Sequence, residues 1–191
     1  KETFILATGD YVKAEEEGEI VAVVHSHPFA QPEPSIADKV ACEKSNLEWF
    51  IVNPTIEKWG YCKPSGFKLP LVGREFSFGI IDCYTLVRDY FKQELNIEMR
   101  DYFREDYFWE KGISLYEDNF EKEGFKKVPI KEIKKHDLLF MHLESNIPNH
   151  AAIYLGDQQI LHHLNMRLSS RDVLGEYYMK NTAFVARHKT L

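Results

Sequence analysis

The spacing of apolar residues changes along the second half of the chain, and this change constrains the fold more than any other feature. After Asp82, apolar residues recur at helical spacing up to Leu95, and a second helix is expected over residues 113–123. Beyond Pro129 the pattern becomes one of short apolar runs separated by turns. These runs cover residues 138–143, 150–155, 159–164 and 182–188. Helices followed by a meander of strands predict an α+β fold.

The first third of the chain has a different pattern. Residues 20–24 and 49–52 are continuous apolar runs, which we expect to be buried strands, and a helical stretch from Ser35 to Glu48 lies between them. This order indicates an α/β arrangement. Prolines and glycines then break the pattern between residues 53 and 74. We therefore predict two domains, residues 1–65 and residues 66–191.

Charge and composition exclude several classes of protein. The net charge of −6 would repel the phosphates of a nucleic acid, so we expect no nucleic-acid partner. No run of about 18 or more apolar residues occurs, so we expect no membrane span. The three cysteines cannot all pair and form no CxxC motif, so each is interpreted alone. The chain begins at Lys1 without a methionine, which indicates a fragment or the ordered part of a longer chain.

Cys83 directly follows Asp82, the expected N-cap of the amphipathic helix. Free backbone N–H groups and the positive end of the helix dipole would stabilise a thiolate at this position. Such a nucleophile needs a histidine as base and a third group that orients the base. The alternative interpretation is that Cys83 is a small buried hydrophobic residue, as Cys42 is expected to be in its own helix.

His150 begins one expected strand, and His162 and His163 lie on the next. A three-residue loop centred on Gly156 would place His150 opposite His162, whereas a two-residue loop would place it opposite His163. Since neighbouring residues of a strand point to opposite faces, only one of the two histidines can join a site with His150. The spacing alone leaves both registers open, and it also allows the histidines to be surface or core groups without a catalytic role.

Three blocks of this region resemble the NlpC/P60 cysteine peptidases. Residues 82–87 read Asp-Cys-Tyr-Thr-Leu-Val, and residues 149–157 read Asn-His-Ala-Ala-Ile-Tyr-Leu-Gly-Asp. The third polar residue of the family falls twelve positions after the histidine, on His162. Asp137 begins a block similar to the strand that follows Gly-Asp in the family. This chain differs from most members in having Tyr84 instead of serine and in lacking a tyrosine about a dozen residues before Cys83.

The resemblance implies a papain-like α+β fold for residues 66–191. Cys83 would attack an amide carbonyl, His150 would act as general base and then as acid, and His162 would orient the imidazole. The backbone N–H of Cys83 is the expected oxyanion donor. Members cleave amide bonds in the stem peptides of peptidoglycan, typically the D-γ-glutamyl–diaminopimelate bond, and this chemistry needs no cofactor.

A second group of polar residues follows the first expected strand, where residues 24–28 read Val-His-Ser-His-Pro. His25 and His27 are two apart and so point the same way in an extended chain. Ser35 follows, with Asp38 one helical turn beyond it. Two imidazoles and a carboxylate suit a catalytic zinc. Alternatively, Ser35 and Asp38 form a simple helix-capping pair and the histidines are exposed.

Together these residues resemble the JAMM (MPN+) metalloprotease motif. The resemblance implies that His25, His27 and Asp38 ligate zinc and that Ser35 supports the tetrahedral intermediate. The glutamate that serves this family as general base lies well upstream. The glutamates of this region are all too close to the strand for that role, and they are Glu2, Glu15, Glu16, Glu17 and Glu19. We therefore expect an incomplete JAMM-type domain over residues 1–65, with zinc as its possible cofactor and no peptidase activity of its own.

A JAMM-type domain followed directly by an NlpC/P60 domain resembles the tail tip proteins of lambda-like phages. The leading hypothesis is a thiol endopeptidase that cleaves peptidoglycan stem peptides during tail assembly or host entry. Its partners would be peptidoglycan peptides and other tail tip proteins. It would be made in the host cytoplasm, carried at the virion tail tip and active at the host cell wall. The alternatives are a zinc isopeptidase or processing protease acting through the first domain, and a catalytically silent assembly factor.

Overall fold

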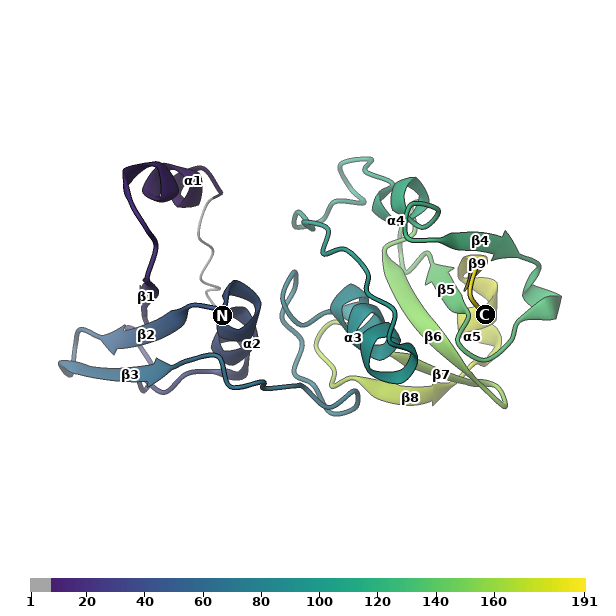
Figure 1. The fold of residues 1–191 in the computed structure, drawn as a ribbon. Helices are drawn as coiled ribbons and strands as arrows, with labels where there is room; N and C mark the ends of the chain where they lie inside the picture. The colour runs from purple at the N-terminus through teal and green to yellow at the C-terminus, as the bar shows by residue number, and fades with distance from the viewer. Residues whose placement is uncertain (1–7) are drawn as a thin grey trace. The chain divides into compact units, whose positions relative to one another are not determined.

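The structure, a computed structural model that describes residues 8–191, divides into two compact units. The first unit ends at Leu69 and the second runs from Pro70 to Leu191 (Figure 1). The sequence analysis places the boundary after residue 65, within the proline- and glycine-containing segment that joins the units.

The first unit is a three-stranded sheet with one helix packed against it. Its elements are α1 (Thr8–Glu17), β1 (Ala22–Ser26), α2 (Ile36–Ser45), β2 (Glu48–Asn53) and β3 (Lys58–Cys62). The strand order is β1-β2-β3, with β1 parallel to β2 and β2 antiparallel to β3. Helix α2 ends at Ser45, earlier than the predicted end at Glu48. The reason is that Asn46 has the left-handed conformation (φ 54°) that ends a helix. Strand β3 was not predicted, since it lies in the segment broken by glycine and proline.

The second unit is built on a six-stranded antiparallel sheet. Its elements are α3 (Cys83–Leu95), α4 (Leu115–Asn119), β4 (Phe125–Val128), the 3₁₀ helix η1 (Ile130–Glu132), β5 (Leu138–Met141), β6 (His150–Gly156), β7 (Gln159–His162), β8 (Ser170–Val173), α5 (Glu176–Lys180) and β9 (Thr182–His188). The strand order is β4-β9-β5-β6-β7-β8. This architecture confirms the predicted α+β class. The short strands β4 and β8 were not predicted because charged residues interrupt their apolar pattern.

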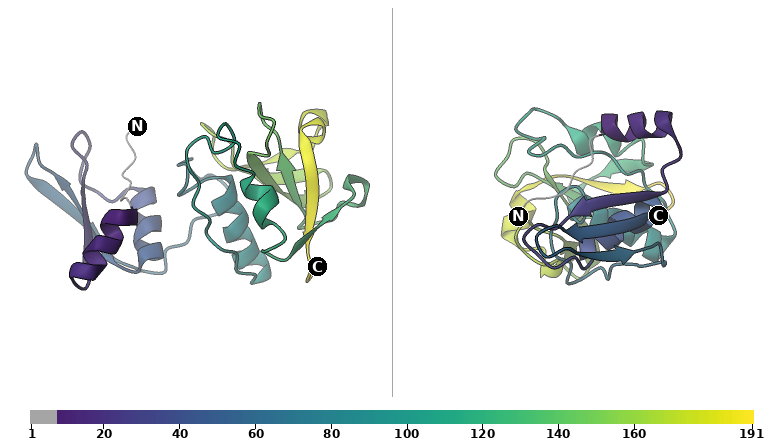
Figure 2. Two further views of the ribbon diagram at one scale, coloured as in Figure 1. Left: turned by 90° about the horizontal axis from the view of Figure 1, so that it is seen from above. Right: turned by 90° about the vertical axis from the view of Figure 1, so that its left-hand side faces the viewer.

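Helices cover both faces of the second sheet (Figures 1 and 2). On one face, α3 and α4 pack against alternate residues of the central strands, including Leu138, Ala151 and Ile153. On the other face, Tyr178 of α5 packs with a second cluster that includes Met141. The small side chains of Ala151 and Ala152, both fully buried, let the helices approach β6 closely on either side.

The β6–β7 hairpin differs in register from both sequence predictions. Its turn consists of Asp157 and Gln158, which both have positive φ (48° and 55°), as a type I′ turn requires. A register shift occurs between Tyr154 and Gly156, and His162 consequently lies opposite Ala152. His150 begins β6 two residues earlier on the same face, so the two histidines are diagonal neighbours instead of a direct pair.

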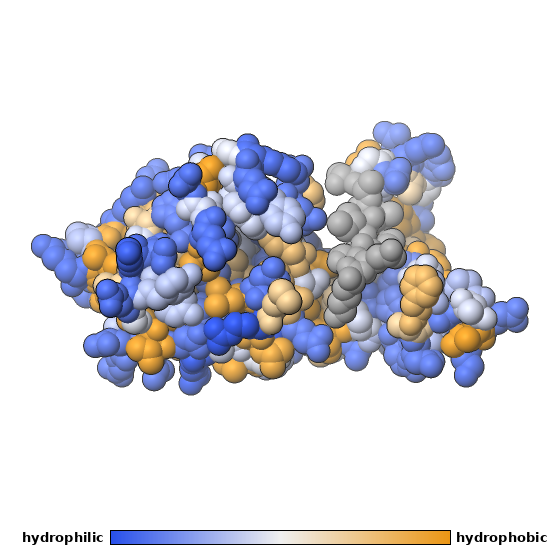
Figure 3. Space-filling model, turned by 180° about the vertical axis from the view of Figure 1, so that it is seen from behind, coloured by the Kyte–Doolittle hydropathy of each residue, from blue (hydrophilic) through white to orange (hydrophobic). Residues whose placement is uncertain are grey.

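Hydrophilic residues predominate on the face of the molecule shown in Figure 3, with hydrophobic residues scattered among them. None of the helices within residues 8–191 combines the length and the apolar composition that crossing a membrane requires.

Gly60 offers a test of the packing in the first unit. A Cβ at this position would overlap the carbonyl group of Pro32, 2.8 Å from its carbon atom. We expect Gly60→Ala to lower the free energy of unfolding of this unit by about 2 kcal/mol or more, measured by urea-induced unfolding. Gly18→Ala is the matched control, because a Cβ there meets no atom within 4 Å. Equal unfolding midpoints for the two variants would contradict the close approach of β3 to Pro32.

Candidate active site and candidate metal centre

A buried carboxylate fixes the start of helix α3. The Asp82 side chain accepts hydrogen bonds from the backbone N–H of Thr85 (2.9 Å) and of Gly79 (2.9 Å), which makes it the N-cap that the sequence predicts. It also accepts a 2.6 Å hydrogen bond from Nε of Arg104. Both side chains of this ion pair are almost fully buried. Arg104 donates further hydrogen bonds to the carbonyl oxygens of Gly79 and Tyr102. Its buried charge is therefore both paired and hydrogen-bonded.

This arrangement places Cys83 at the first turn of α3, facing β6. Its sulfur lies 3.4 Å from the hydroxyl oxygen of Tyr116 and is hydrogen-bonded to the backbone amide of Ala151, the residue after His150. Tyr116 was not identified from the sequence, because it comes from α4, 33 residues further along the chain. It supplies a hydroxyl at the thiol, although the chain lacks the tyrosine that many family members have before the cysteine.

The protonation state of Cys83 differs from the sequence prediction. Burial raises the pKa of the Cys83 thiol to about 11, and the negative charge of Asp82 acts in the same direction. Hydrogen bonds from Tyr116 and Ala151 lower this pKa in part. The raised pKa runs against the expectation of a thiolate at the helix N-terminus, because burial disfavours the charged form of the thiol. At neutral pH the sulfur carries its proton.

The two histidines that the motif predicts are brought together in the structure. Nε2 of His150 lies 3.2 Å from Nδ1 of His162, and both side chains are buried. His163 points to the other face of β7, where its ring meets that of Phe76 at 5.1 Å. Burial, together with the smaller effect of the neighbouring imidazoles, lowers the pKa of His150 to about 3. His150 is therefore neutral at pH 7 and able to accept a proton.

Asp172 on β8 extends this row of side chains. One of its oxygens lies 3.1 Å from Nε2 of His162. The same carboxylate accepts hydrogen bonds from the hydroxyls of Ser170 (3.1 Å) and Tyr178 (3.2 Å). Burial lowers the pKa of His162, whereas Asp172 opposes this shift. Asp172 was not identified from the sequence. The available signal was the polar–apolar alternation at the end of Ser-Arg-Asp-Val, which favours a strand that would present this side chain.

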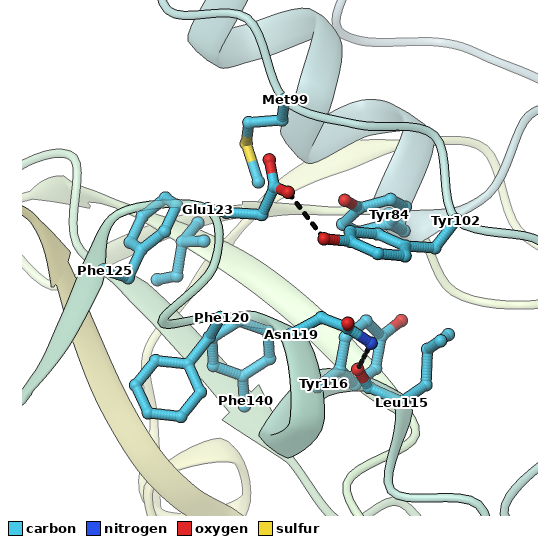
Figure 4. A pocket seen from close by; sticks show the side chains of 11 residues that line it. Tyr84, Met99, Tyr102, Leu115, Tyr116, Asn119, Phe120, Glu123, Phe125 and Phe140 are labelled. Carbon is cyan, nitrogen blue, oxygen red and sulfur yellow. Dashed lines mark hydrogen bonds between the residues drawn. The ribbon is translucent and has the colours of Figure 1, made fainter.

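A small apolar cavity lies beside Tyr84 and Tyr116 (Figure 4). Its volume is about 20 Å³, which is room for about one water molecule. Its lining includes Met99, Phe120 and Glu123, and the Glu123 carboxylate accepts a hydrogen bond of 2.6 Å from the Tyr102 hydroxyl. The cavity is too small for a peptide, so it belongs to the packing around Tyr116.

In the first unit, the three predicted zinc ligands converge. Nε2 of His25 lies 3.1 Å from Nε2 of His27 and 3.2 Å from Oδ1 of Asp38, and Nε2 of His27 lies 3.4 Å from Oδ2 of Asp38. The three ligand atoms form one group that can hold a metal ion. Ligand atoms at the usual 2.0–2.1 Å around a tetrahedral zinc are about 3.3–3.4 Å from each other. The residues present therefore fit this metal.

Ser35 and Asp38 form the helix-capping pair of the alternative interpretation, although His25 is buried and not exposed. The Ser35 side chain accepts a hydrogen bond from the backbone N–H of Asp38 (3.1 Å), and the Ser35 N–H donates to the Asp38 carboxylate (2.7 Å). These bonds fix Asp38 at the helix start with an oxygen toward each histidine. Burial raises the pKa of Asp38, but hydrogen bonds from His25 and Ser35 outweigh this effect and lower it overall.

The glutamates considered for the general base lie elsewhere. Glu15, Glu16 and Glu17 belong to the last turn of α1 and are exposed, and Glu19 follows this helix. Glu2 lies outside the described residues. Within residues 8–191, the group that can hold a metal ion contains none of these glutamates.

Comparison with known proteins relates both units to described families. Residues 73–187 match the NlpC/P60 family, and residues 6–61 match the prokaryotic homologs of the JAB domain. The tail tip assembly protein K of Escherichia phage lambda is 42% identical over 181 residues, which are 94% of this chain and 87% of that protein. The tail tip assembly protein K of Escherichia phage N15 is 38% identical over 192 residues, which are 98% of this chain and 77% of that protein.

Solved structures of the NlpC/P60 family are more distant. An NLP/P60 family protein similar to a lipoprotein, from Staphylococcus aureus subsp. aureus Mu50, aligns with a TM-score of 0.44 and 17% identity. The alignment covers 61% of this chain but 37% of the staphylococcal chain, so less than half of that relative is matched. The NlpC/p60 domain of the peptidoglycan hydrolase SagA aligns with a TM-score of 0.43 and 17% identity, over 61% of this chain and 89% of that domain.

The raised pKa of Cys83 predicts how the thiol reacts with iodoacetamide. Because only the thiolate reacts, we expect the alkylation rate at Cys83 to rise about tenfold per pH unit from pH 6.5 to 10, without a plateau. The rate is measured for each cysteine by peptide mass spectrometry. The same peptide in urea is the control, where the rate should level off above about pH 9. A pH-independent rate between pH 5 and 8 in the folded chain would show an ionised resting thiol and contradict the prediction.

Proposed function

Because the chain belongs to the family of tail tip assembly protein K and its second unit to the NlpC/P60 family, we propose that it is a phage tail tip protein whose second unit is a thiol endopeptidase. Its substrates are the amide bonds of peptidoglycan stem peptides. Two observations support this proposal: the sulfur of Cys83, at the start of α3, is hydrogen-bonded to the amide of Ala151, and His150, the residue before Ala151, is paired with His162.

The reaction proceeds in two halves. The sulfur of Cys83 attacks the amide carbonyl and its proton passes to His150. The tetrahedral intermediate collapses to a thioester as His150 returns the proton to the departing amine. Water then attacks the thioester, with His150 again accepting a proton, and the carboxylic acid leaves with the thiol restored. His162 holds the orientation of the His150 ring throughout.

The oxyanion of each intermediate needs hydrogen-bond donors. The backbone N–H of Cys83, at the start of a helix, is one donor because it has no partner within the helix. The hydroxyl of Tyr116 is a second donor. Burial raises the pKa of Tyr116 well above its usual value of 10, so this hydroxyl is protonated, and able to donate, at neutral pH.

The protonation states of Cys83 and His150 before substrate binds determine when the proton moves. With the thiol protonated and His150 neutral, the proton moves during the attack and not before it, as in serine peptidases. The buried site therefore holds neither a thiolate at Cys83 nor an imidazolium at His150 until substrate enters.

Recruitment to the cell wall does not depend on overall charge. The net charge of −6 provides no attraction to an anionic wall polymer. We propose that other tail tip proteins hold the chain in the virion and bring it to the host cell wall, after synthesis in the host cytoplasm.

The endopeptidase is tested by incubating the purified chain with cell-wall sacculi and analysing the released muropeptides by mass spectrometry. We expect stem peptides cut at one amide bond, and loss of cleavage by more than about a thousandfold in Cys83→Ala, since the nucleophile is removed. Cys62→Ala is the matched control and should retain activity, because Cys62 lies in the other unit. Unchanged stem peptides with a free, titratable Cys83 thiol would contradict the proposal.

An infection assay separates the enzyme from a silent assembly factor. On the proposed function, phage carrying Cys83→Ala assemble normal tails and are impaired in entering the host. Normal infection by this phage would show that the unit serves assembly alone.

The convergence of His25, His27 and Asp38 favours a second candidate function, a zinc site in the first unit. These residues would hold the ion, which when bound supplies Lewis-acid activation of a carbonyl or of water. Ser35, at the start of α2, would support an intermediate formed nearby. A zinc isopeptidase or processing protease would also need a general base that the group of three does not contain.

Metal analysis tests this site. We expect close to one zinc ion per chain after equilibration with a small excess of zinc, and its loss in His27→Ala because one of three ligands is removed. His142→Ala in the second unit is the control and should bind as the unchanged chain does. Equal zinc contents in the His27→Ala variant and the unchanged chain would contradict the assignment.

A further inference from the structure

A carboxylate outside the predicted catalytic set ends the row of side chains that begins at His150 and continues through His162. Asp172 lies on β8, opposite Ile160 and so on the same face of the sheet as His162. We propose that Asp172 is a positioning residue of the peptidase site, which sets the tautomer of His162 and through it that of His150. This inference rests on the proposed function of the second unit. It adds a fourth residue to the proposed set of Cys83, His150 and His162.

The hydrogen-bond directions follow from what each group can donate. An ionised carboxylate only accepts hydrogen bonds, so Nε2 of His162, 3.1 Å from Asp172, carries a proton. In neutral His162 the other nitrogen, Nδ1, is then an acceptor. It lies 3.2 Å from Nε2 of His150, which must therefore be the protonated nitrogen of that ring. Nδ1 of His150 is then unprotonated and free to accept a proton, as the proposed function requires of the base.

Without Asp172, nothing would fix which of the two histidines donates the hydrogen bond between them and which accepts it. Two neutral imidazoles in contact can exchange donor and acceptor roles, and the reversed order leaves a proton on Nδ1 of His150. The base would then be in the wrong tautomer for Cys83. The carboxylate thus removes an ambiguity that the His150–His162 pair has by itself.

The surroundings hold Asp172 in place and keep it ionised. The hydroxyl of Ser170 bonds to one oxygen, and the hydroxyl of Tyr178 from α5 bonds to the oxygen that faces His162. Arg167 lies 3.4 Å from the same oxygen. Burial raises the pKa of Asp172, but its hydrogen bonds to His162 and Ser170 and the charge of Arg167 lower it overall. The carboxylate is therefore an acceptor throughout the neutral pH range.

The negative charge also acts during the reaction. When His150 becomes an imidazolium, it donates from Nε2 to His162, and the polarised His162 donates to Asp172. The charge that develops in a buried site is thereby spread toward a fixed anion. Asp172 makes this contribution without contact with the substrate or with the sulfur.

The test compares Asp172→Asn with Asp157→Asn, which changes an exposed aspartate in the turn of the β6–β7 hairpin. The two variants change the net charge equally. We expect Asp172→Asn to lower kcat for stem-peptide cleavage by about tenfold or more with little change in KM. The acidic limb of its pH–rate profile should move to lower pH, because His150 loses the stabilisation of its charged form. Asp172→Glu, which restores a carboxylate, should recover part of the activity, and Asp157→Asn should match the unchanged chain.

Nitrogen NMR of the histidine side chains provides a readout that does not need activity. In the unchanged chain at pH 7 we expect protons on Nε2 of both His150 and His162, and a change of tautomer in Asp172→Asn. A proton on Nδ1 of His162 in the unchanged chain, or full activity with an unshifted pH profile in Asp172→Asn, would overturn the inference. Absence of cleavage by the unchanged chain would instead refute the proposed function, whereas the NMR result decides the hydrogen-bond order by itself.

Discussion

The buried ion pair between Asp82 and Arg104 is the interaction on which the second unit depends. Removing one partner of such a pair costs about 3–5 kcal/mol, because the remaining charge is left buried and unpaired. Here the same carboxylate also caps α3, so the pair fixes both the position of the helix and the place where its first N–H groups point. The sulfur of Cys83 meets the Ala151 amide and the Tyr116 hydroxyl because the helix starts at this residue and no other.

The chemistry of the site follows from its burial. The thiol of Cys83 and the histidine pair are all buried away from water, and this disfavours any charge on them at rest. The pKa of Cys83 rises to about 11 and that of His150 falls to about 3 for the same reason. A site of this kind keeps its nucleophile inactive until a substrate brings the carbonyl that accepts the sulfur. In the first unit, too, one carboxylate has two roles. Asp38 caps α2 and also contacts both His25 and His27.

The sequence predicts those parts of the fold and site that depend on local patterns. The N-cap at Asp82, the amphipathic helix after it and the apolar strands of the central sheet all have strong periodic signals, and the structure contains them. The convergence of His25, His27 and Asp38 was expected from the resemblance to the JAMM motif, since a loop separates the end of β1 from the helix that carries Asp38. The predicted register of His150 and His162 was wrong, because a turn at Asp157–Gln158 and a bulge in β6 together shift the pairing. Tyr116 and Asp172 were not found, since the first meets Cys83 across 33 residues and the second lies on a strand of charged residues.

The account depends on the sulfur of Cys83 becoming bonded to the substrate. The most direct measurement is acid quenching of the chain during its first turnover of a purified stem peptide, followed by mass spectrometry of the peptide that contains Cys83. The account predicts a mass increase at Cys83 equal to the acyl half of the substrate, joined as a thioester and lost on further incubation before quenching. Cleavage of the stem peptide with no adduct at Cys83 throughout the first turnover, or with an adduct at Cys42 or Cys62 instead, would contradict it.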